Sequence, residues 1–432
     1  MQNVKGTYDF FGDEQELRTA VQSTLREVFE LYGFRGMDTA ILNELELLTA
    51  KYAGGDEIQK EIYKLSDQGE RRLGLRYDLT IPFSKVVAWN PGIELPFRRY
   101  EFGKVFRDGP VKRGRLREFL QCDVDVTGAP GEETEAELML LAAEAFKRLN
   151  IPITIKWNNR LFLGELLNRM GVPDSETSSV MLTLDKLEKI GPENVLGELG
   201  EKGIGGSTIE AIGRLLGARE RPTFEQAAAS YDLETSLGAR QVRSLQNLLS
   251  QVGLNETCEF DLFLSRGLSF YTGTVYEIFD ATGSFSSSLG GGGRYDAIIG
   301  KLAGREDLDY PTVGLSFGME SIMAHLRERE SALQRQPAAP LAAVIPIGVS
   351  ATADALRTAA LLRAEGIRAS LDTSGRKLKR SLGSASAAGA RFAILIGEEE
   401  REQGKVLLKD MANQTERLAD VEEAIYIVSK YM

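Results

Sequence analysis

Polar and apolar residues alternate along residues 98–128, and this alternation predicts two long strands joined by a polar turn. Successive side chains of a strand point to opposite faces. One face of the second strand would carry Arg115, Arg117, Phe119, Gln121, Asp123 and Asp125. The other face would carry Leu120, Cys122, Val124 and Val126, which we expect to point into a core. The segment Asp108-Gly109-Pro110 favours chain reversal between the strands.

The polar face of this predicted hairpin has two interpretations. Arginines, an aromatic ring and carboxylates at fixed spacing can together hold an anion, stack a base and bind an ammonium group. Charged strand faces are also common at the edges of sheets. The pattern alone therefore leaves open a substrate-binding hairpin and a solvated, salt-bridged edge hairpin.

Helical and extended patterns alternate on both sides of the hairpin. Apolar spacing and helix-start residues predict helices over residues 14–31, 42–52, 81–89 and 132–149. Shorter alternating runs predict strands over residues 34–40, 62–65, 73–76 and 153–157. Residues 159–252 contain almost no strand pattern, so we expect a helical insertion there, with its clearest helices over residues 161–170, 175–187 and 237–252.

Strand patterns return after the insertion, over residues 259–263, 271–279 and 311–317, and a helix is predicted over residues 318–329. Between them stands a run of four glycines, 290–293, which would let a backbone or a flat ligand approach closely. Glycines alone also suit a flexible loop. Because Arg294, Tyr295 and an apolar helix follow directly, we expect an ordered strand.

The last hundred or so residues show a different pattern of predicted secondary structure. The segment SALQRQPAAP, residues 331–340, has the composition of a linker, and strands and helices alternate beyond it. We therefore predict a core formed by residues 1–158 and 253–330, a helical insertion of residues 159–252, the linker, and a small α/β domain of residues 341–432.

Composition narrows the classes of function. The chain has 432 residues, of which 43% are hydrophobic and 27% charged, as in ordinary globular proteins. Its acidic amino terminus does not resemble a signal peptide, and no apolar run reaches the roughly 18 residues of a membrane span, so we expect a cytoplasmic location without membrane association. Two distant cysteines and one histidine, His325, argue against structural zinc and a histidine-based triad. We expect both cysteines to be buried and inert, His325 to be a packing or surface residue, and the chain to bind no metal of its own.

The net charge of −11 argues against indiscriminate nucleic-acid binding but allows a local basic footprint. Two short clusters, Lys112–Arg117 and Arg376–Arg380, have the required charge. Each cluster is either a phosphate-binding surface or a solvated face.

Seven motifs occur in order along the chain: KGTYDF, LRYDLTIPFSK, RGRLREFLQCDVDVTG, SRGLSFYTGTVYE, GGGGRYD, SGRKLKR and ARFAILIGEEE. By these motifs the chain resembles the histidyl-tRNA synthetases, a family of class II aminoacyl-tRNA synthetases, over nearly its whole length. The resemblance implies an α+β fold with a six-stranded antiparallel sheet, flanking helices and a helical insertion, followed by an α/β anticodon-binding domain. It also implies a homodimer that activates L-histidine with ATP and Mg²⁺ and transfers the histidyl group to the 3′ end of tRNA(His).

Roles for individual residues follow from the resemblance alone. Arg107 and Arg266 would contact the α-phosphate as catalytic groups, with Arg107 also holding the amino-acid carboxylate. Phe119 would stack the adenine and Arg115 would bind the ATP phosphates. The residues expected to bind the histidine amino group or orient the substrate are Asp78, Thr80, Gln121 and Asp125, and those expected to line its side-chain pocket are Phe270 and Tyr271. The tRNA would contact Lys112 and Arg113 near its acceptor end and Arg376, Lys377, Lys379 and Arg380 near the anticodon stem.

The chain departs from the family pattern at several positions. Ser321 stands where the third class II motif has an arginine over the ATP γ-phosphate, and Arg294 is a candidate to replace that charge. Ser269 and Phe270 replace an aspartate and a tyrosine, and Ala40 replaces a proline at the expected dimer interface. These changes leave two alternatives to a ligase: a non-charging paralogue that senses histidine, like the regulatory subunit of ATP phosphoribosyltransferase, and an RNA-binding module.

Overall fold

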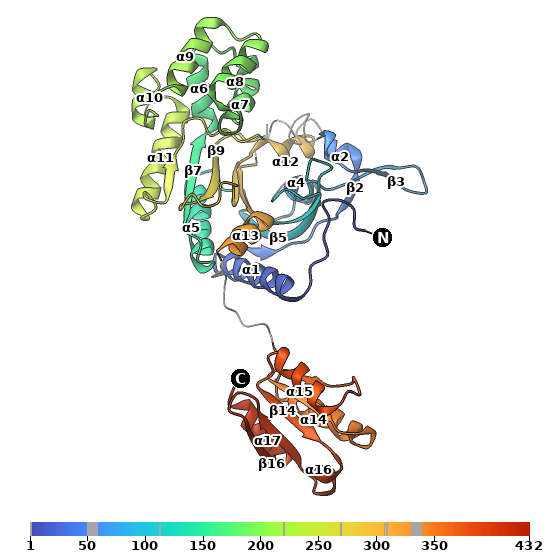
Figure 1. The fold of residues 1–432 in the computed structure, drawn as a ribbon. Coiled ribbons are helices and arrows are strands. Elements are labelled where there is room, and N and C mark those ends of the chain that lie inside the picture. Colours follow the sequence, from blue (N-terminus) through green and yellow to red (C-terminus); the bar gives the residue numbers. More distant parts are fainter. Residues whose placement is uncertain are drawn as a thin grey trace. The chain divides into compact units, whose positions relative to one another are not determined.

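The computed structural model describes all residues except Met1, 50–58, 112–113, 219–220, 268–269, 306, 308–309 and 330–338. Lys112, Arg113, Ser269 and most of the predicted linker therefore lie outside the described residues. The chain forms two compact units, built mainly from Leu17–Leu333 and from Gln334–Met432 (Figure 1).

An eight-stranded sheet forms the centre of the larger unit. Its strands follow the order β1-β5-β6-β11-β10-β9-β7-β8. The inner six pair in an antiparallel way throughout, and β1 and β8 add a short parallel strand at each edge. This confirms the expected six-stranded antiparallel core. The strands are β1 (Arg35–Gly36), β5 (Phe97–Phe106), β6 (Glu118–Thr127), β7 (Ile153–Asn159), β8 (Cys258–Phe260), β9 (Thr274–Asp280), β10 (Gly290–Arg294) and β11 (Thr312–Gly318).

Three helices pack on one face of this sheet: α1 (Gly12–Leu31), α5 (Glu133–Arg148) and α13 (Met319–Glu328). The ring of Phe317 lies at the centre of this layer, 5.4 Å from the ring of Phe29 in α1 and 5.6 Å from that of Phe146 in α5. The apolar face of β6 points into the same layer, where Cys122, Val124 and Val126 are fully buried as expected.

The opposite face of β6 is not solvated, so the edge-hairpin interpretation is wrong. The hairpin β5–β6 lies between β1 and β11, and Asp123 and Asp125 are only 4% and 3% exposed. Over this face lie α4 (Thr80–Trp89), α12 (Ala297–Leu302) and a small antiparallel sheet of β2 (Leu42–Glu44), β4 (Arg72–Leu75) and β3 (Lys64–Ser66). The prediction of a helix over residues 42–52 is partly wrong: its first three residues form β2, α2 (Leu45–Thr49) follows, and residues 50–52 lie outside the described residues.

Helices form the predicted insertion, and its described residues contain no strand between Arg160 and Gln251. Asn159 caps the first helix by accepting hydrogen bonds from the backbone N–H groups of Leu161 and Phe162. The described part of the insertion forms six helices: α6 (Arg160–Arg169), α7 (Asp174–Leu184), α8 (Leu187–Glu201), α9 (Gly206–Leu216), α10 (Phe224–Ser230) and α11 (Leu237–Gln251).

The smaller unit is an α/β domain with the strand order β13-β12-β14-β15-β16. The predicted strand and helix alternation is confirmed, but β16 was not predicted because four of its five residues are exposed and give no apolar pattern. Its elements are β12 (Ala342–Pro346), α14 (Thr352–Ala364), β13 (Ala369–Leu371), α15 (Leu378–Ala387), β14 (Phe392–Ile396), α16 (Glu398–Glu402), β15 (Val406–Asp410), β16 (Thr415–Ala419) and α17 (Val421–Ser429).

The cysteines and the histidine are packing residues. Burial raises the pKa of the half-buried Cys258 to about 12, so its thiol stays protonated, and Cys122 is completely buried. His325 is 1% exposed and stacks on Phe285 with ring centroids 5.4 Å apart. Among the described residues, no helix is both long enough and apolar enough to span a membrane.

Candidate active site

A cavity of about 240 Å³ lies over the polar face of the large sheet. Its wall comes from β6, β9, β10 and β11, from the starts of α4 and α13, and from loops that include the residue directly after β5. The structure brings together seven of the predicted site residues there: Asp78, Thr80, Arg107, Phe119, Gln121, Arg266 and Tyr271.

Arg107 and Phe119 form one end of the cavity. Arg107 follows β5, and its guanidinium carbon lies 5.1 Å from the centroid of the Phe119 ring in β6. Its Nε donates a hydrogen bond of 3.0 Å to the carbonyl oxygen of Tyr77, which fixes the plane of the guanidinium group. A positioned planar cation beside an aromatic ring suits a ligand that carries both a phosphate and a base. Burial lowers the pKa of Arg107 below that of a free arginine.

Arg266 reaches the cavity from the loop before β9. Its backbone adopts a left-handed conformation, with φ of 59°, which is uncommon for a residue with a side chain and often occurs at functional sites. Its Nη1 lies 3.4 Å from Oε1 of Glu277. Gly291 in β10 provides the space for this side chain, because a Cβ atom there would lie 2.1 Å from Nη1 of Arg266. The glycine run is therefore an ordered, buried strand that admits an arginine.

Acidic and amide groups occupy the rest of the wall. Oδ1 of Asp78 accepts a hydrogen bond of 3.1 Å from the backbone N–H of Ile81 in the first turn of α4. Burial raises the pKa of Asp78 to about 6. Nε2 of Gln121 donates to the hydroxyl of Ser316 at 3.0 Å and lies 3.4 Å from Oδ1 of Asp123. These groups can bind a cationic ligand group near Arg107.

Three predicted site residues lie outside the cavity wall. Asp125 is beneath it, where Oδ2 forms an ion pair of 2.7 Å with Arg99. The ring of Phe270 packs behind the wall at 4.8 Å from that of Tyr271. Arg115 is at the surface, with its side chain 48% exposed and paired with Glu61 at 2.6 Å.

Several wall residues were not predicted, among them Asp123, Glu277, Ser288, Ser316 and Glu320. The sequence could have predicted Asp123, since strand alternation places it on the same face as Gln121 and Asp125. No local pattern could have predicted Ser316 and Glu277, because their positions depend on the order of the strands. Ser316 pairs with Asp123 across β11 and β6, and Glu277 pairs with Gly291 across β9 and β10.

Ser321 lines the cavity, so the position of the missing third-motif arginine does face the site. Arg294 does not replace it. Its Nε and Nη2 each donate a 2.6 Å hydrogen bond to the carboxylate of Glu135, and its side chain is absent from the cavity wall. The hypothesis that Arg294 compensates for Ser321 is therefore wrong, since a buried bidentate ion pair occupies its guanidinium group.

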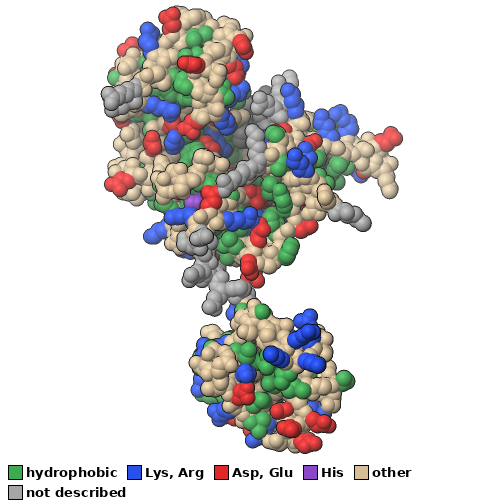
Figure 2. Space-filling model, in the orientation of Figure 1, with side chains coloured by type: hydrophobic (Ala, Val, Ile, Leu, Met, Phe, Trp, Pro, Cys, Tyr) green, Lys and Arg blue, Asp and Glu red, His purple; other side chains and the backbone are tan. Residues whose placement is uncertain are grey.

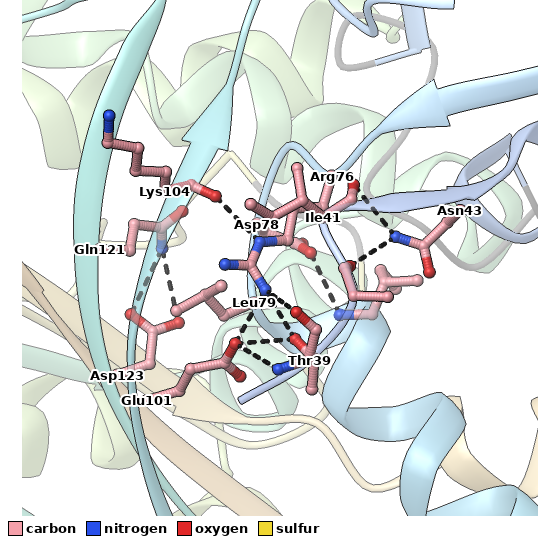
Figure 3. A network of polar contacts seen from close by, with 12 residues as sticks. Thr39, Ile41, Asn43, Arg76, Asp78, Leu79, Glu101, Lys104, Gln121 and Asp123 are labelled. Atoms are coloured by element: carbon pink, nitrogen blue, oxygen red, sulfur yellow. Dashed lines mark hydrogen bonds and ion pairs between the residues drawn. The ribbon is translucent and has the colours of Figure 1, made fainter. Parts of the chain in front are cut away.

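A buried polar network supports the wall from behind (Figure 3). Arg76, which is 1% exposed, donates from Nη1 to Oε1 of Glu101 at 2.8 Å and to the carbonyl oxygen of Thr39 at 2.6 Å. Its Nε donates to the carbonyl oxygen of Lys104 in β5 at 2.9 Å. The network thus ties the loop after β1 to the strand that leads into Arg107.

A second cavity of about 720 Å³ adjoins the first. The two share Arg266, Glu277 and Ser288, and the second extends to the residues between α7 and α8 of the insertion. A ligand in the first cavity can therefore be approached from the side of the helical insertion.

Comparison with known proteins gives a consistent result. A family model described as histidyl-tRNA synthetase matches residues 6–322, and one described as an anticodon binding domain matches residues 342–431. The chain is 44% identical over 434 residues to histidine–tRNA ligase 1 of Bacillus cereus, covering 100% of this chain and 99% of that protein. It is 34% identical over 455 residues to a Bacteroides fragilis histidine–tRNA ligase, covering 99% and 98%.

Solved structures agree with the sequence relatives. The crystal structure of histidyl-tRNA synthetase from Nostoc sp. PCC 7120 matches with a TM-score of 0.81 and 25% identity, covering 100% of this chain and 99% of that one. A structure from Bacillus halodurans, titled ATP phosphoribosyltransferase regulatory subunit/histidyl-tRNA synthetase, matches with a TM-score of 0.73 and covers 92% of this chain. At 20% identity that second match concerns the fold alone.

Proposed function

This chain belongs to the histidyl-tRNA synthetase family, and we propose that it is a histidine–tRNA ligase that activates L-histidine with ATP and transfers the histidyl group to the 3′ end of tRNA(His). The observation that carries the proposal is the cavity, whose wall contains Arg107, Phe119 and Arg266 together with the acidic and amide groups suited to an ammonium ion. Full-length similarity to proteins named histidine–tRNA ligase supports it.

In the proposed reaction, a carboxylate oxygen of histidine attacks the α-phosphorus of ATP, and pyrophosphate leaves with the electrons of the broken bond. Arg107 and Arg266 stabilise the charge that develops on the phosphoryl oxygens, and Phe119 stacks the adenine. Asp78, Thr80, Gln121 and Asp125 bind or orient the amino acid, Phe270 and Tyr271 shape its side-chain pocket, and Arg115 binds the ATP phosphates. Magnesium would enter with the ATP, and the carboxylate of Glu277 in the cavity wall would be a ligand of the kind it prefers, whereas both oxygens of Glu320 already accept hydrogen bonds from Arg18.

The second cavity suits the transfer step. Once the adenylate fills the first cavity, the ribose hydroxyl of the tRNA must approach from another side. The shared wall at Arg266, Glu277 and Ser288 offers that approach.

We retain residues 1–158 and 253–330 as the catalytic core, residues 159–252 as the insertion, residues 331–340 as the linker and residues 341–432 as the anticodon-binding domain. We further propose a cytoplasmic homodimer, and sedimentation equilibrium tests the oligomeric state.

Two activities test the proposed function: histidine-dependent exchange of pyrophosphate into ATP, and histidylation of tRNA by the same preparation. We expect both, with Ser321 tolerated. Exchange without charging would indicate a repurposed adenylating enzyme. Histidine binding with neither activity would indicate a sensor, an alternative that the full-length match to ligases and the anticodon-domain match make less favourable.

The basic segment at the start of α15, Arg376–Arg380, is proposed to contact tRNA phosphates. Arg376, Lys377, Lys379 and Arg380 are all exposed. Figure 2 shows a group of Lys and Arg side chains on the smaller unit, apart from a group of acidic ones. Changing Arg376 and Lys379 to glutamate should weaken tRNA binding and reduce the slope of log affinity against log salt by roughly two, because each phosphate contact contributes about one unit.

The control for this variant reverses the charge of Lys147 and Arg169, two exposed residues of the larger unit. Both double variants change the net charge equally. Filter binding at several salt concentrations measures the slopes, and pyrophosphate exchange should stay unchanged in both variants. An equal loss of tRNA affinity in the two variants would contradict a local footprint on the smaller unit.

A further inference from the structure

The segment that carries Arg266 has a strained backbone. Residues 261–267 lie between β8 and β9 and form neither a helix nor a strand. Within them Arg266 adopts the left-handed conformation, with φ of 59°, which crowds the Cβ atom of any residue except glycine. Such a conformation persists only where the surrounding structure holds it in place. The contacts that hold Arg266 therefore decide where its guanidinium group points.

Arg160, the first residue of α6, supplies two of these contacts. Its Nη1 donates a hydrogen bond of 3.0 Å to the carbonyl oxygen of Ser265 and one of 3.3 Å to that of Arg266. These two carbonyl groups belong to the planar peptide units on either side of the Arg266 Cα atom, so holding both oxygens restricts φ and ψ of Arg266 together. Arg160 is itself fixed, because its backbone N–H donates to the carbonyl oxygen of Gly273 at 2.9 Å and the residue is only 5% exposed.

The helical insertion also contacts the two neighbours of this residue. The hydroxyl of Ser265, a fully buried residue, donates a hydrogen bond of 2.7 Å to the carbonyl oxygen of Met181 in α7. Directly after α7, Oδ2 of Asp185 lies against Gly267, where a Cβ atom would be 3.1 Å from that oxygen. Arg266 and both of its neighbours in the sequence are thus held by α6 and by the end of α7.

We propose that Arg160 is a positioning residue for the activation step: it holds the backbone of Arg266 in the left-handed conformation and thereby aims the guanidinium group at the α-phosphate. This inference rests on the proposed function and adds to it a role for the helical insertion, whose first helix sets the geometry of a catalytic group. Arg160 is absent from the walls of both cavities, so it acts through Arg266 and not on the substrate. The effect can be large, because misplacing a catalytic group by about 1 Å can cost about a hundredfold in rate.

The test measures kcat and KM of histidine-dependent pyrophosphate exchange. Arg160→Met keeps an unbranched side chain but removes the donors, and we expect kcat to fall about ten- to a hundredfold while KM for histidine and for ATP stays within about twofold, because the lost alignment matters most in the transition state. Arg160→Lys retains a charged donor and should keep more activity. Arg329→Met is the matched control: Nη1 of Arg329 also donates to a backbone carbonyl oxygen at 3.0 Å, that of Asn150, but lies outside the cavity wall, and its loss should leave exchange unchanged.

A double variant separates positioning from a general effect on the fold. In Arg160→Met/Arg266→Gln the exchange rate should equal that of Arg266→Gln alone, because the group that Arg160 positions is already missing. Losses that multiply would show that Arg160 supports the site by another route and would overturn the inference. A rise in KM with kcat unchanged would overturn it as well.

Ser265→Ala tests the same restraint with a smaller change. It removes the hydrogen bond to Met181, whose carbonyl oxygen still accepts one from the N–H of Asp185 at 3.0 Å, so the variant should fold like the wild type. We expect kcat to fall about two- to tenfold, the range for one neutral hydrogen bond, and this loss should also disappear in the Arg266→Gln background. Unchanged kcat in both Arg160→Met and Ser265→Ala would overturn the positioning role and leave the ligase assignment in place. Wild-type protein without exchange activity would overturn both.

Discussion

Replacing Arg266 with glutamine is expected to reduce histidine-dependent pyrophosphate exchange by about a hundred- to a thousandfold, the usual cost of removing one positioned donor from a developing oxyanion. Its guanidinium group lines the cavity and forms an ion pair with Glu277. Gly291 has no side chain and so leaves room for this guanidinium group. Glutamine is shorter than arginine and neutral, so it places neither a donor nor a positive charge where the guanidinium group lies. The loss should appear in kcat, since the interaction strengthens as charge develops on the phosphoryl oxygens.

Two further variants make the Arg266 result interpretable. Arg266→Lys keeps the charge without the planar fork and should retain more exchange activity than the glutamine variant. Arg305→Gln removes an exposed arginine whose ion-pair partner among the described residues is Asp307 at 3.0 Å, and it should leave exchange unchanged. Exchange within threefold of the wild type in Arg266→Gln would rule out a catalytic role for this residue.

The central hairpin was the most predictable part of the site. Strand alternation alone placed Phe119 and Gln121 on one face and Cys122 and Val124 on the other, and the structure confirms both faces. The alternation pattern does not show which strands pair with the hairpin on either side. The strand β11 joins it from nearly two hundred residues away in sequence, and this pairing turns an apparently solvated polar face into a buried cavity wall.

Long-range ion pairs were the least predictable part. Arg294 had the right charge to compensate for Ser321, but its partner Glu135 lies on α5, and no local pattern links the two. Similarly, Arg18 of α1 forms a bidentate pair with Glu320 in the cavity wall at 2.6 and 2.8 Å. The structure therefore leaves Ser321 without a described arginine in its place, and the exchange assay addresses its consequence directly.

Replacing Arg76 with methionine should lower the free energy of unfolding of the larger unit by about 3 kcal/mol, the lower range for breaking a buried ion pair. The side chains of Arg76 and Glu101 are 2% and 0% exposed, so water cannot replace the lost partner (Figure 3). Glu101 would keep hydrogen bonds from the backbone N–H and hydroxyl of Thr39 and a 3.4 Å contact with Arg99. These remaining interactions are the reason for expecting the lower range.

The matched double variant Arg76→Met/Glu101→Gln decides what the ion pair contributes. If most of the cost of Arg76→Met is the uncompensated charge on Glu101, neutralising that charge should restore part of the stability, and the two changes should not be additive. Differential scanning calorimetry of both variants measures this, with the transition of the smaller unit as an internal reference. Additive losses would instead mean that the hydrogen bonds from Arg76 to the carbonyl oxygens of Thr39 and Lys104 carry the stability, so that its main role is to hold backbone segments rather than to pair with Glu101.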